Sequence, residues 1–232
     1  MELRELLGRA LGGSYTVDRE IGGAVMSRVF VAEDSRLRRK VVVKVLDPSL
    51  AGGVNVERFA REIALAATLQ HPCIVPLLTA GDVDGVPYYT MPFVEGPSLR
   101  QRLQDARLSP AEAMQVLRDV ASALDAAHRR GIVHRDVKPE NVLLSGDYAM
   151  VTDFGIAKAL VVAAATENAG SGSGEQITER GIALGTPAYM APEQIAGDER
   201  IDHRSDIYSW GVLAYEVLAG TAPFAGRSSQ AL

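Results

Sequence analysis

Several residue types and patterns are scarce in this 232-residue chain. Its one cysteine, Cys73, cannot form an internal disulfide, which indicates a reducing compartment such as the cytoplasm. Cys73 lies in the apolar run "HPCIVPLL", so we expect a buried side chain and not a reactive thiol. The longest uncharged apolar stretch, "ALVVAAA" at 159–165, is too short to span a bilayer. We therefore expect no membrane contact by this chain itself, and a longer, membrane-anchored protein of which it is the cytoplasmic part stays open as an alternative.

Basic residues are not in excess either, because the chain has 24 Lys and Arg against 29 Asp and Glu, which gives a net charge of −5. Such a balance gives no general attraction to nucleic acid. The first residues, "MELRELLGRALGG", carry early acidic groups and do not form a secretory signal. Leu3, Leu6, Leu7 and Ala10 recur at helical spacing, which predicts a short amphipathic helix within an extension at 1–14.

The rest of the chain changes character near residue 95. Before it, the runs "SYTVDREI", "SRVFVAED", "KVVVKVL" and "VPYYTMPFV" predict strands, interrupted by one helix in "VERFAREIALAATLQ". After it, helix dominates, and Ser109 to Glu112 form a capping box that opens a helix running to about Arg130. A small strand-rich half followed by a larger helical half predicts an α+β protein of two lobes with a cleft between them.

Most candidate catalytic and metal-binding side chains lie in the stretch "GIVHRDVKPENVLLSGDYAMVTDFG", which contains H-R-D-x-K-x-x-N followed by D-F-G. Its Asp136, Asn141 and Asp153 offer carboxylate and amide oxygens on loops beside strand ends. That ligand set suits Mg²⁺ with retained waters and substrate phosphates. It does not suit zinc, which prefers His and Cys clusters.

These motifs resemble the catalytic core of the eukaryotic-like (Hanks-type) serine/threonine protein kinases, especially the bacterial members. The resemblance implies a bilobal fold, with an antiparallel-sheet N-lobe, regulatory helix and hinge at 15–94. A mainly helical C-lobe would follow at 95–232, without its last helices. The implied activity is transfer of the ATP γ-phosphoryl group to Ser or Thr hydroxyls of protein substrates, with Mg²⁺ or Mn²⁺. A kinase homodimer is a further partner that the resemblance leaves open.

The resemblance also implies a role for each catalytic residue. Asp136 would accept or orient the substrate hydroxyl proton, and Lys138 would neutralise charge on the transferred phosphoryl group. Asn141 and Asp153 would hold the metal ions, while His134 and Phe154 pack beneath them. Lys44, on a half-buried strand, needs a partner for its charge. The family pairs this lysine with a helix glutamate, for which Glu62 fits, and with the α- and β-phosphates.

The implied nucleotide pocket begins with "IGGAVMSRV", where a family member would carry three glycines. Gly22 is kept, but Ala24 and Ser27 replace the second and third glycines, so we expect weakened ATP binding. Met91 would lie at the back of the adenine pocket, before the hinge residues Pro92, Phe93 and Val94. The full predicted set is Ile21, Gly22, Gly23, Ala24, Ser27, Val29, Val42, Lys44, Met91, Pro92, Val94, Leu143 and Asp153. Val42 stands where the family usually has a smaller alanine.

The stretch "GIALGTPAYMAPEQ" resembles the end of a protein-kinase activation segment, which small-molecule phosphotransferases lack. Together with Lys138, Thr186 in this segment points to Ser or Thr as the acceptor. Arg135, beside Asp136, would await a phosphorylated loop residue, and Thr178 lies where bacterial members carry an autophosphorylated threonine. Further on, Asp206 in "HRSDIYSWGVLAYEVLAG" would hold the catalytic-loop backbone by hydrogen bonds.

Two alternatives stay open beside an active protein kinase. The altered glycine loop and the early end of the chain are compatible with a pseudokinase or scaffold that binds partners with weak or no catalysis. A small-molecule phosphotransferase is disfavoured by "GTPAYMAPEQ". Because the chain ends soon after its predicted central helix, we expect part of that helix to be uncovered, at Trp210, Val212, Leu213, Val217 and Leu218.

Overall fold

The structure is a computed structural model that describes residues 3–24, 27–46, 56–154, 187–198 and 201–223. Thr178 and Thr186, the predicted regulatory threonines, lie outside the described residues. The chain divides into two compact units. The first contains residues 1–68 and 76–93, and the second contains residues 69–75 and 94–158 together with the described part of the chain after 186. The short segment 69–75 thus belongs to the helical unit although it lies in the strand-rich half of the sequence.

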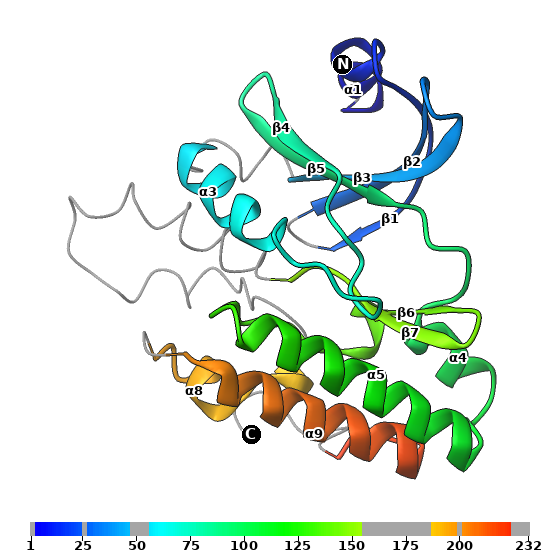
Figure 1. Ribbon diagram of the computed structural model, residues 1–232, viewed down its shortest axis with the longest axis vertical. Helices are drawn as coiled ribbons and strands as arrows, with labels where there is room; N and C mark the ends of the chain where they lie inside the picture. Colours follow the sequence, from blue (N-terminus) through cyan, green and yellow to red (C-terminus); the bar gives the residue numbers. More distant parts are fainter. Residues whose placement is uncertain (1–2, 25–26, 47–55, 155–186, 199–200, 224–232) are drawn as a thin grey trace. The chain divides into compact units, whose positions relative to one another are not determined.

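The first unit is built on an antiparallel five-stranded sheet in the order β1-β2-β3-β5-β4 (Figure 1). The strands are β1 (Tyr15–Ala24), β2 (Ser27–Asp34), β3 (Arg39–Leu46), β4 (Thr79–Val83) and β5 (Val86–Pro92). Four of them match the predicted runs. The fifth, β4, has the sequence TAGDV, which is poor in the β-branched and aromatic residues that mark a strand, and the sequence did not reveal it.

The predicted N-terminal helix is present as α1 (Leu3–Leu11), and it covers one face of this sheet. Leu3, Leu7 and Leu11 are buried together with Phe30 of β2 and with the valines of β3 at 41, 43 and 45. The predicted apolar face was therefore wrong in one position, because Ala10 is exposed and Leu11 packs inward instead.

Strand alternation places Lys44 on the opposite face of the sheet from α1. Val43 and Val45 point into the core with α1, so Val42 and Lys44 point the other way. Helix α3 (Val56–Ala66) belongs to the same unit and buries Phe59 and Ile63. Its Glu62 is half-buried, as is Lys44.

The second unit is mainly helical and contains one hairpin. Its helices are α4 (Leu99–Asp105), α5 (Pro110–His128), η1 (Pro139–Asn141), η3 (Pro187–Tyr189), α8 (Pro192–Ile195) and α9 (His203–Ala219), and its strands are β6 (Val142–Ser145) and β7 (Tyr148–Val151). The predicted capping box is confirmed at the start of α5, where the Ser109 hydroxyl accepts from the Glu112 N–H and Glu112 accepts from the Ser109 N–H. Helices α5 and α9 lie side by side (Figure 1).

The core of this unit packs α5 against the hairpin and α9. Cys73 is buried there, as the sequence predicted, and burial with the nearby charge of Asp119 raises the pKa of its thiol. Asp119 accepts from the Gln115 side chain at 2.9 Å and from the Ala149 N–H at 2.9 Å, which fixes β7 to α5.

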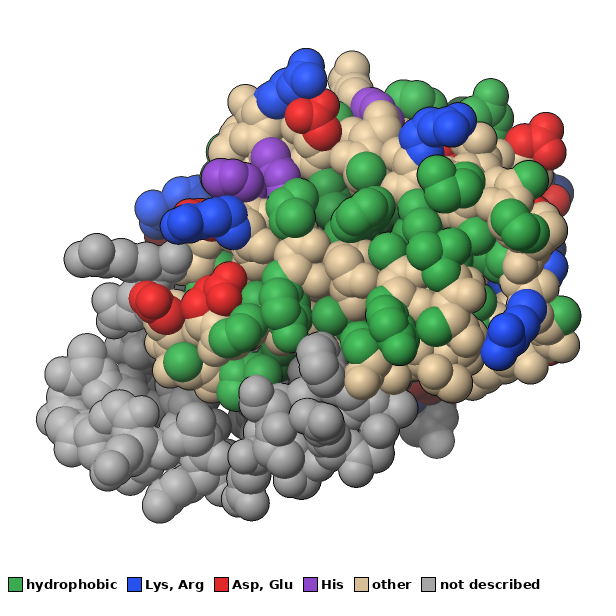
Figure 2. All heavy atoms as spheres, turned by 90° about the horizontal axis from the view of Figure 1, so that it is seen from below, with side chains coloured by type: hydrophobic (Ala, Val, Ile, Leu, Met, Phe, Trp, Pro, Cys, Tyr) green, Lys and Arg blue, Asp and Glu red, His purple; other side chains and the backbone are tan. Residues whose placement is uncertain are grey.

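The surface of α9 is only partly as predicted. Val212, Leu213 and Val217 are each at most 5% exposed. Leu213 and Val217 belong to the core cluster that also contains apolar residues of α5 and the hairpin. Leu218 is 60% exposed, with Tyr215 at 53% and Ile207 at 51%. Figure 2 shows hydrophobic side chains gathered over much of the face seen from below. Within the described residues, no helix is long and apolar enough to cross a membrane.

Candidate active site

The loop from His134 to Asn141 is anchored from inside the second unit by a histidine. His134 is completely buried, and its ring contacts the ring of Phe154 edge-on with centroids 4.6 Å apart. The Asp136 N–H donates to His134 Nδ1 at 3.2 Å, so the ring proton lies on Nε2, which donates to the Thr152 carbonyl at 2.8 Å. His134 thereby joins the H-R-D and D-F-G segments, and its predicted packing against Phe154 is confirmed.

The carboxylate of Asp136 is held by the two side chains that follow it in the loop. Lys138 Nζ lies 2.7 Å from Asp136 Oδ2, and Asn141 Nδ2 donates to the same oxygen at 2.9 Å. Asn141 also donates to the Asp136 carbonyl at 2.8 Å. The three polar groups that the sequence placed within six residues thus form one cluster, in which the carboxylate has a fixed direction.

Asp206 of α9 fixes the backbone of the same loop. It is completely buried and accepts from the His134 N–H at 2.8 Å and the Arg135 N–H at 2.7 Å. The ring of His128, at the end of α5, donates to it at 2.7 Å. The predicted tether is confirmed, and His128 is a third donor that the sequence did not reveal.

Two residues of this region adopt a backbone conformation that side chains disfavour. Arg135 has φ of 70° and Asp153 has φ of 69°, both in the left-handed region. Such positions cost on the order of 1–3 kcal/mol each and persist where the surroundings enforce them. For Arg135 the constraint comes from Asp206, and from Gln194 of α8, whose amide donates to the Arg135 carbonyl at 2.8 Å.

The donor set fits a magnesium ion that is bound together with a nucleotide. Because the amide nitrogen of Asn141 already donates twice to Asp136, its Oδ1 is the atom with which Asn141 would hold a cation. The Asn141 carbonyl accepts from the Thr152 N–H at 3.0 Å, directly before Asp153. No group of three or more His, Cys, Asp or Glu side chains that could hold a metal is found in the described ranges. Magnesium needs none, because phosphates and waters complete its shell.

The predicted nucleotide loop comprises the end of β1 and the start of β2 in the first unit. Gly22 has φ of 151°, which glycine adopts readily, and a Cβ on Gly23 would lie 2.4 Å from the Ser27 carbonyl oxygen. Ala24 ends β1 and pairs with Ser27, a strand conformation that alanine adopts without strain.

The remaining predicted pocket residues of the first unit lie on neighbouring strands. Val29 pairs with Lys44 across β2 and β3, and Val42 pairs with Met91 across β3 and β5. Val42 and Met91 are 7% exposed, and Ile21 is 47% exposed. The chain then leaves the sheet at Pro92, followed by half-buried Val94. In the second unit, Leu143 is half-buried in β6.

Beside the loop 134–141 lies a polar network that the sequence did not reveal. Arg100 of α4 donates to Glu140 of the loop, to Glu216 of α9 and to the Tyr189 hydroxyl. These residues are 40, 116 and 89 positions from Arg100 in the chain, so no local spacing connects them.

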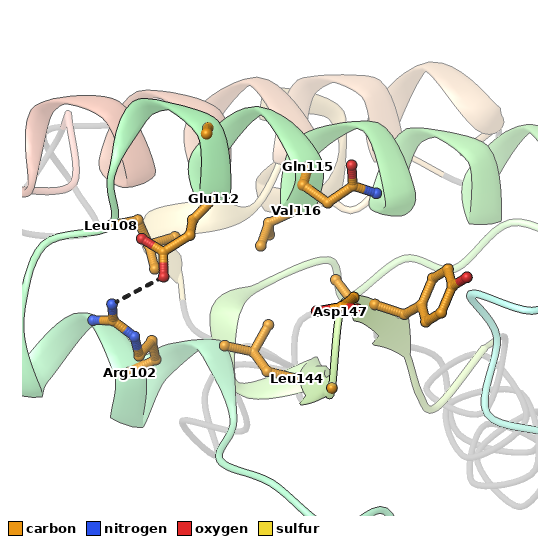
Figure 3. Close-up of a pocket in the computed structure, with 11 residues that line it drawn as sticks. Arg102, Leu108, Glu112, Gln115, Val116, Leu144 and Asp147 are labelled. Carbon is orange, nitrogen blue, oxygen red and sulfur yellow. Dashed lines mark hydrogen bonds and ion pairs between the residues drawn. The ribbon is translucent and has the colours of Figure 1, made fainter.

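The second unit also has a hollow of about 560 Å³ between α4, α5 and the β6–β7 turn (Figure 3). Leu108, Val116 and Leu144 point into it, and Arg102 and Glu112 form an ion pair across its end at 3.4 Å. None of its lining residues belongs to the loop 134–141, so it is separate from the predicted catalytic residues of that loop.

Comparison with known proteins identifies the class to which this fold and loop belong. The family model for the protein kinase domain matches residues 15–232. The chain therefore belongs to the protein kinase family, as its motifs indicated.

The relatives are bacterial. The chain is 39% identical over 221 residues to the serine/threonine-protein kinase pkn2 of Myxococcus xanthus, covering 93% of this chain and 25% of the relative. It is 40% identical over 225 residues to the serine/threonine-protein kinase PknB of Mycobacterium tuberculosis, covering 94% of this chain and 34% of the relative. The chain thus spans about a quarter to a third of the length of these curated relatives.

A solved structure supports the fold. The PknI kinase domain of Mycobacterium tuberculosis aligns with a TM-score of 0.70 at 32% identity, covering 93% of this chain and 76% of that one. The predicted fold class, with an antiparallel-sheet N-lobe and a helical C-lobe, is confirmed.

Proposed function

We propose that this chain is the catalytic domain of a serine/threonine protein kinase, which transfers the γ-phosphoryl group of ATP to Ser or Thr hydroxyls of proteins. The observation that carries the proposal is the Asp136–Lys138–Asn141 cluster, held in place by His134 and Asp206. Catalysis of phosphoryl transfer consists mainly of positioning and charge stabilisation. A fixed carboxylate beside a lysine ammonium group and an amide meets both needs.

Each side chain has its own part in the proposed reaction. Asp136 orients the acceptor hydroxyl and takes its proton, and Lys138 neutralises charge on the phosphoryl group as it moves. Asn141 and Asp153 would hold Mg²⁺, or Mn²⁺, which supplies charge neutralisation of the nucleotide phosphates when bound. Lys44 would bind the α- and β-phosphates, and its pairing with Glu62 is part of this proposal.

The nucleotide site proposed for the first unit consists of the predicted loop, strand and hinge residues. The members are Ile21, Gly22, Gly23, Ala24, Ser27, Val29, Val42, Met91, Pro92 and Val94, with Leu143 and Asp153 from the second unit. Its support is the common face of β3 that carries Val42 and Lys44, away from α1.

Regulation by phosphorylation is a further part of the proposal. Arg135 is close to the catalytic Asp136, and its guanidinium group donates to the Ile201 carbonyl at 3.4 Å. A phosphate on Thr178 would form stronger, charge-assisted bonds with such a group and order the segment between D-F-G and A-P-E. Thr186 would act with Lys138 in selecting Ser or Thr acceptors. The proposed location is the cytoplasm, where ATP is supplied, and a homodimer is the proposed assembly.

A transfer assay tests the proposal against a pseudokinase. The full-length protein and its Asp136→Asn variant are incubated with γ-labelled ATP and a generic basic protein, with magnesium and with a chelator. We expect magnesium-dependent labelling that the variant reduces by about 10²–10⁴-fold, the range for loss of a general base. Labelling that Asp136→Asn leaves unchanged would overturn the assignment. Nucleotide binding without any labelling would favour a pseudokinase.

A further inference from the structure

The hollow of the second unit combines an apolar floor with an acidic rim (Figure 3). Leu108, Val116 and Leu144 point into its volume of about 560 Å³, which is in the range of about 300–1,000 Å³ that ligand pockets occupy. Its rim is exposed at Glu112 and Asp147. A hollow with an exposed rim does not enclose a free molecule, but it can receive a side chain that projects from a larger partner.

The charged residues that line the hollow are one base and two acids, which gives a net charge of −1. Arg102 and Glu112 form an ion pair at one end, and a hydrogen bond from the Ser109 N–H lowers the pKa of Glu112, so this carboxylate stays ionised. The side chain of Asp147, in the turn between β6 and β7, forms no ion pair or hydrogen bond within the described residues. The hollow therefore favours an apolar side chain with a cation beside it.

The turn between β2 and β3 in the first unit has the opposite chemistry. Its Leu37 is 63% exposed, although the side chain is large and apolar. The segment 33–40, with the sequence EDSRLRRK, contains four basic and two acidic residues, which gives a net charge of +2. Arg36 forms no ion pair within the part of the chain that the structure describes, and Arg38 pairs with Glu33 at 3.3 Å in an exposed contact that contributes little. The turn thus presents a leucine between two available guanidinium groups.

Asp34 holds this turn in one conformation. Its Oδ1 accepts from the N–H groups of Arg36 and Leu37, each at 3.0 Å, and its backbone carbonyl accepts from the Arg38 N–H at 2.8 Å. The exposed leucine is therefore presented by an ordered backbone. Because the turn is ordered before it binds, less conformational entropy is lost on binding.

We propose that the β2–β3 turn of one copy docks into the hollow of a second copy. Leu37 would lie on the apolar floor, and the guanidinium groups of Arg36 and Arg38 would lie at the acidic rim near Asp147. The chain thus carries both halves of a contact that match in polarity and have opposite charge. The inference names the surfaces for the homodimer of the proposed function, but it requires no phosphoryl transfer. One turn in one hollow buries little surface, so the association is weak.

Sedimentation velocity of the full chain, without nucleotide, measures this association. The sedimentation coefficient is expected to rise with protein concentration from the micromolar to the millimolar range. Leu37→Ser should weaken the association about 10- to 100-fold, which corresponds to the burial of one leucine side chain. Leu65→Ser is the matched control, because Leu65 on α3 is also exposed, at 56%, and it should leave the association unchanged.

Charge reversal tests which surfaces meet. Arg36→Glu and Asp147→Lys should each weaken the association about fivefold, the scale of one exposed ion pair that becomes a repulsion. A chain that carries both substitutions should associate more strongly than either single variant. An equimolar mixture of Leu37→Ser and Asp147→Lys proteins should also associate more strongly than either protein alone, because each mixed pair keeps one native turn and one native hollow.

A fluorescent ring peptide of residues 33–40 tests the hollow independently of any turn variant that does not fold. Fluorescence anisotropy should show that the peptide binds the wild-type chain. Binding should be about fivefold weaker to Asp147→Lys, and about 10- to 100-fold weaker when the peptide itself carries Leu37→Ser.

Three results would overturn the inference. The first is sedimentation that does not depend on concentration, and the second is association that Leu37→Ser and Asp147→Lys leave unchanged. The third is peptide binding without self-association, which would assign the hollow to a basic segment of another protein. Chains that associate as expected but transfer no phosphate would overturn the proposed function alone.

Discussion

Replacing Asp206 by asparagine is expected to destabilise the second unit by about 3 kcal/mol. Asp206 is completely buried and accepts from three donors, the N–H groups of His134 and Arg135 and the ring of His128. An asparagine has one acceptor oxygen and turns an NH₂ group toward at least one of those donors. A buried donor without an acceptor costs about 1–3 kcal/mol, and the loss of charge weakens the remaining bonds by about 1 kcal/mol.

Urea unfolding followed by circular dichroism measures this loss. With a urea dependence of about 2–3 kcal/mol per molar, the unfolding midpoint should fall by about 1 M. The matched control is Asp125→Asn on α5, whose side chain is 59% exposed and pairs with Arg129 among the described residues. It should shift the free energy of unfolding by no more than about 0.5 kcal/mol. An Asp206→Asn midpoint equal to that of the control would refute the tether as the element that holds the loop.

Four further substitutions probe the proposed nucleotide loop and two helices. Ala24→Gly should lower the KM for ATP several-fold, because a methyl group no longer limits the approach of the phosphates; an unchanged or higher KM contradicts this. Ser109→Ala should lower the free energy of unfolding by about 1 kcal/mol through loss of the α5 cap, as thermal unfolding would measure. Leu7→Ala should cost about 2–5 kcal/mol, because Leu7 is completely buried under the sheet. Gly8→Ala on the same helix should instead add about 0.5–1 kcal/mol, since a Cβ there meets nothing within 4 Å. Reversed signs for the last pair would refute the docking of α1.

Local patterns predicted the elements that depend on nearby residues. The Ser109–Glu112 box spans one helical turn, and the valine-rich β3 has a strong strand composition, so both were visible in the sequence. β4 was not, because its TAGDV sequence forms a strand only by pairing with β5. The inward face of α1 was misplaced at Ala10 because short helices allow more than one apolar face until a sheet selects it.

The candidate site likewise contains parts that a local sequence pattern predicts and parts that only tertiary packing forms. The Asp136–Lys138–Asn141 cluster and the Asp206 tether could be predicted, because the residues that define the sequence motifs are the same residues that make these contacts. The Arg100 network joins side chains up to 116 positions apart, and an arginine in an amphipathic helix is indistinguishable in sequence from a solvated charge. Only tertiary packing brings Glu140, Tyr189 and Glu216 around it.

The central claim is that the proposed kinase transfers the phosphoryl group to Ser or Thr hydroxyls, and that the fixed Asp136 carboxylate orients the accepting hydroxyl. It is tested most directly in a single turnover, with enzyme in excess over γ-labelled ATP and a peptide that contains Ser, Thr and Tyr. The account predicts label on phosphoserine and phosphothreonine, with a rate that Asp136→Asn lowers by about 10²–10⁴-fold. Label on tyrosine, or equal rates in the two proteins, would contradict it.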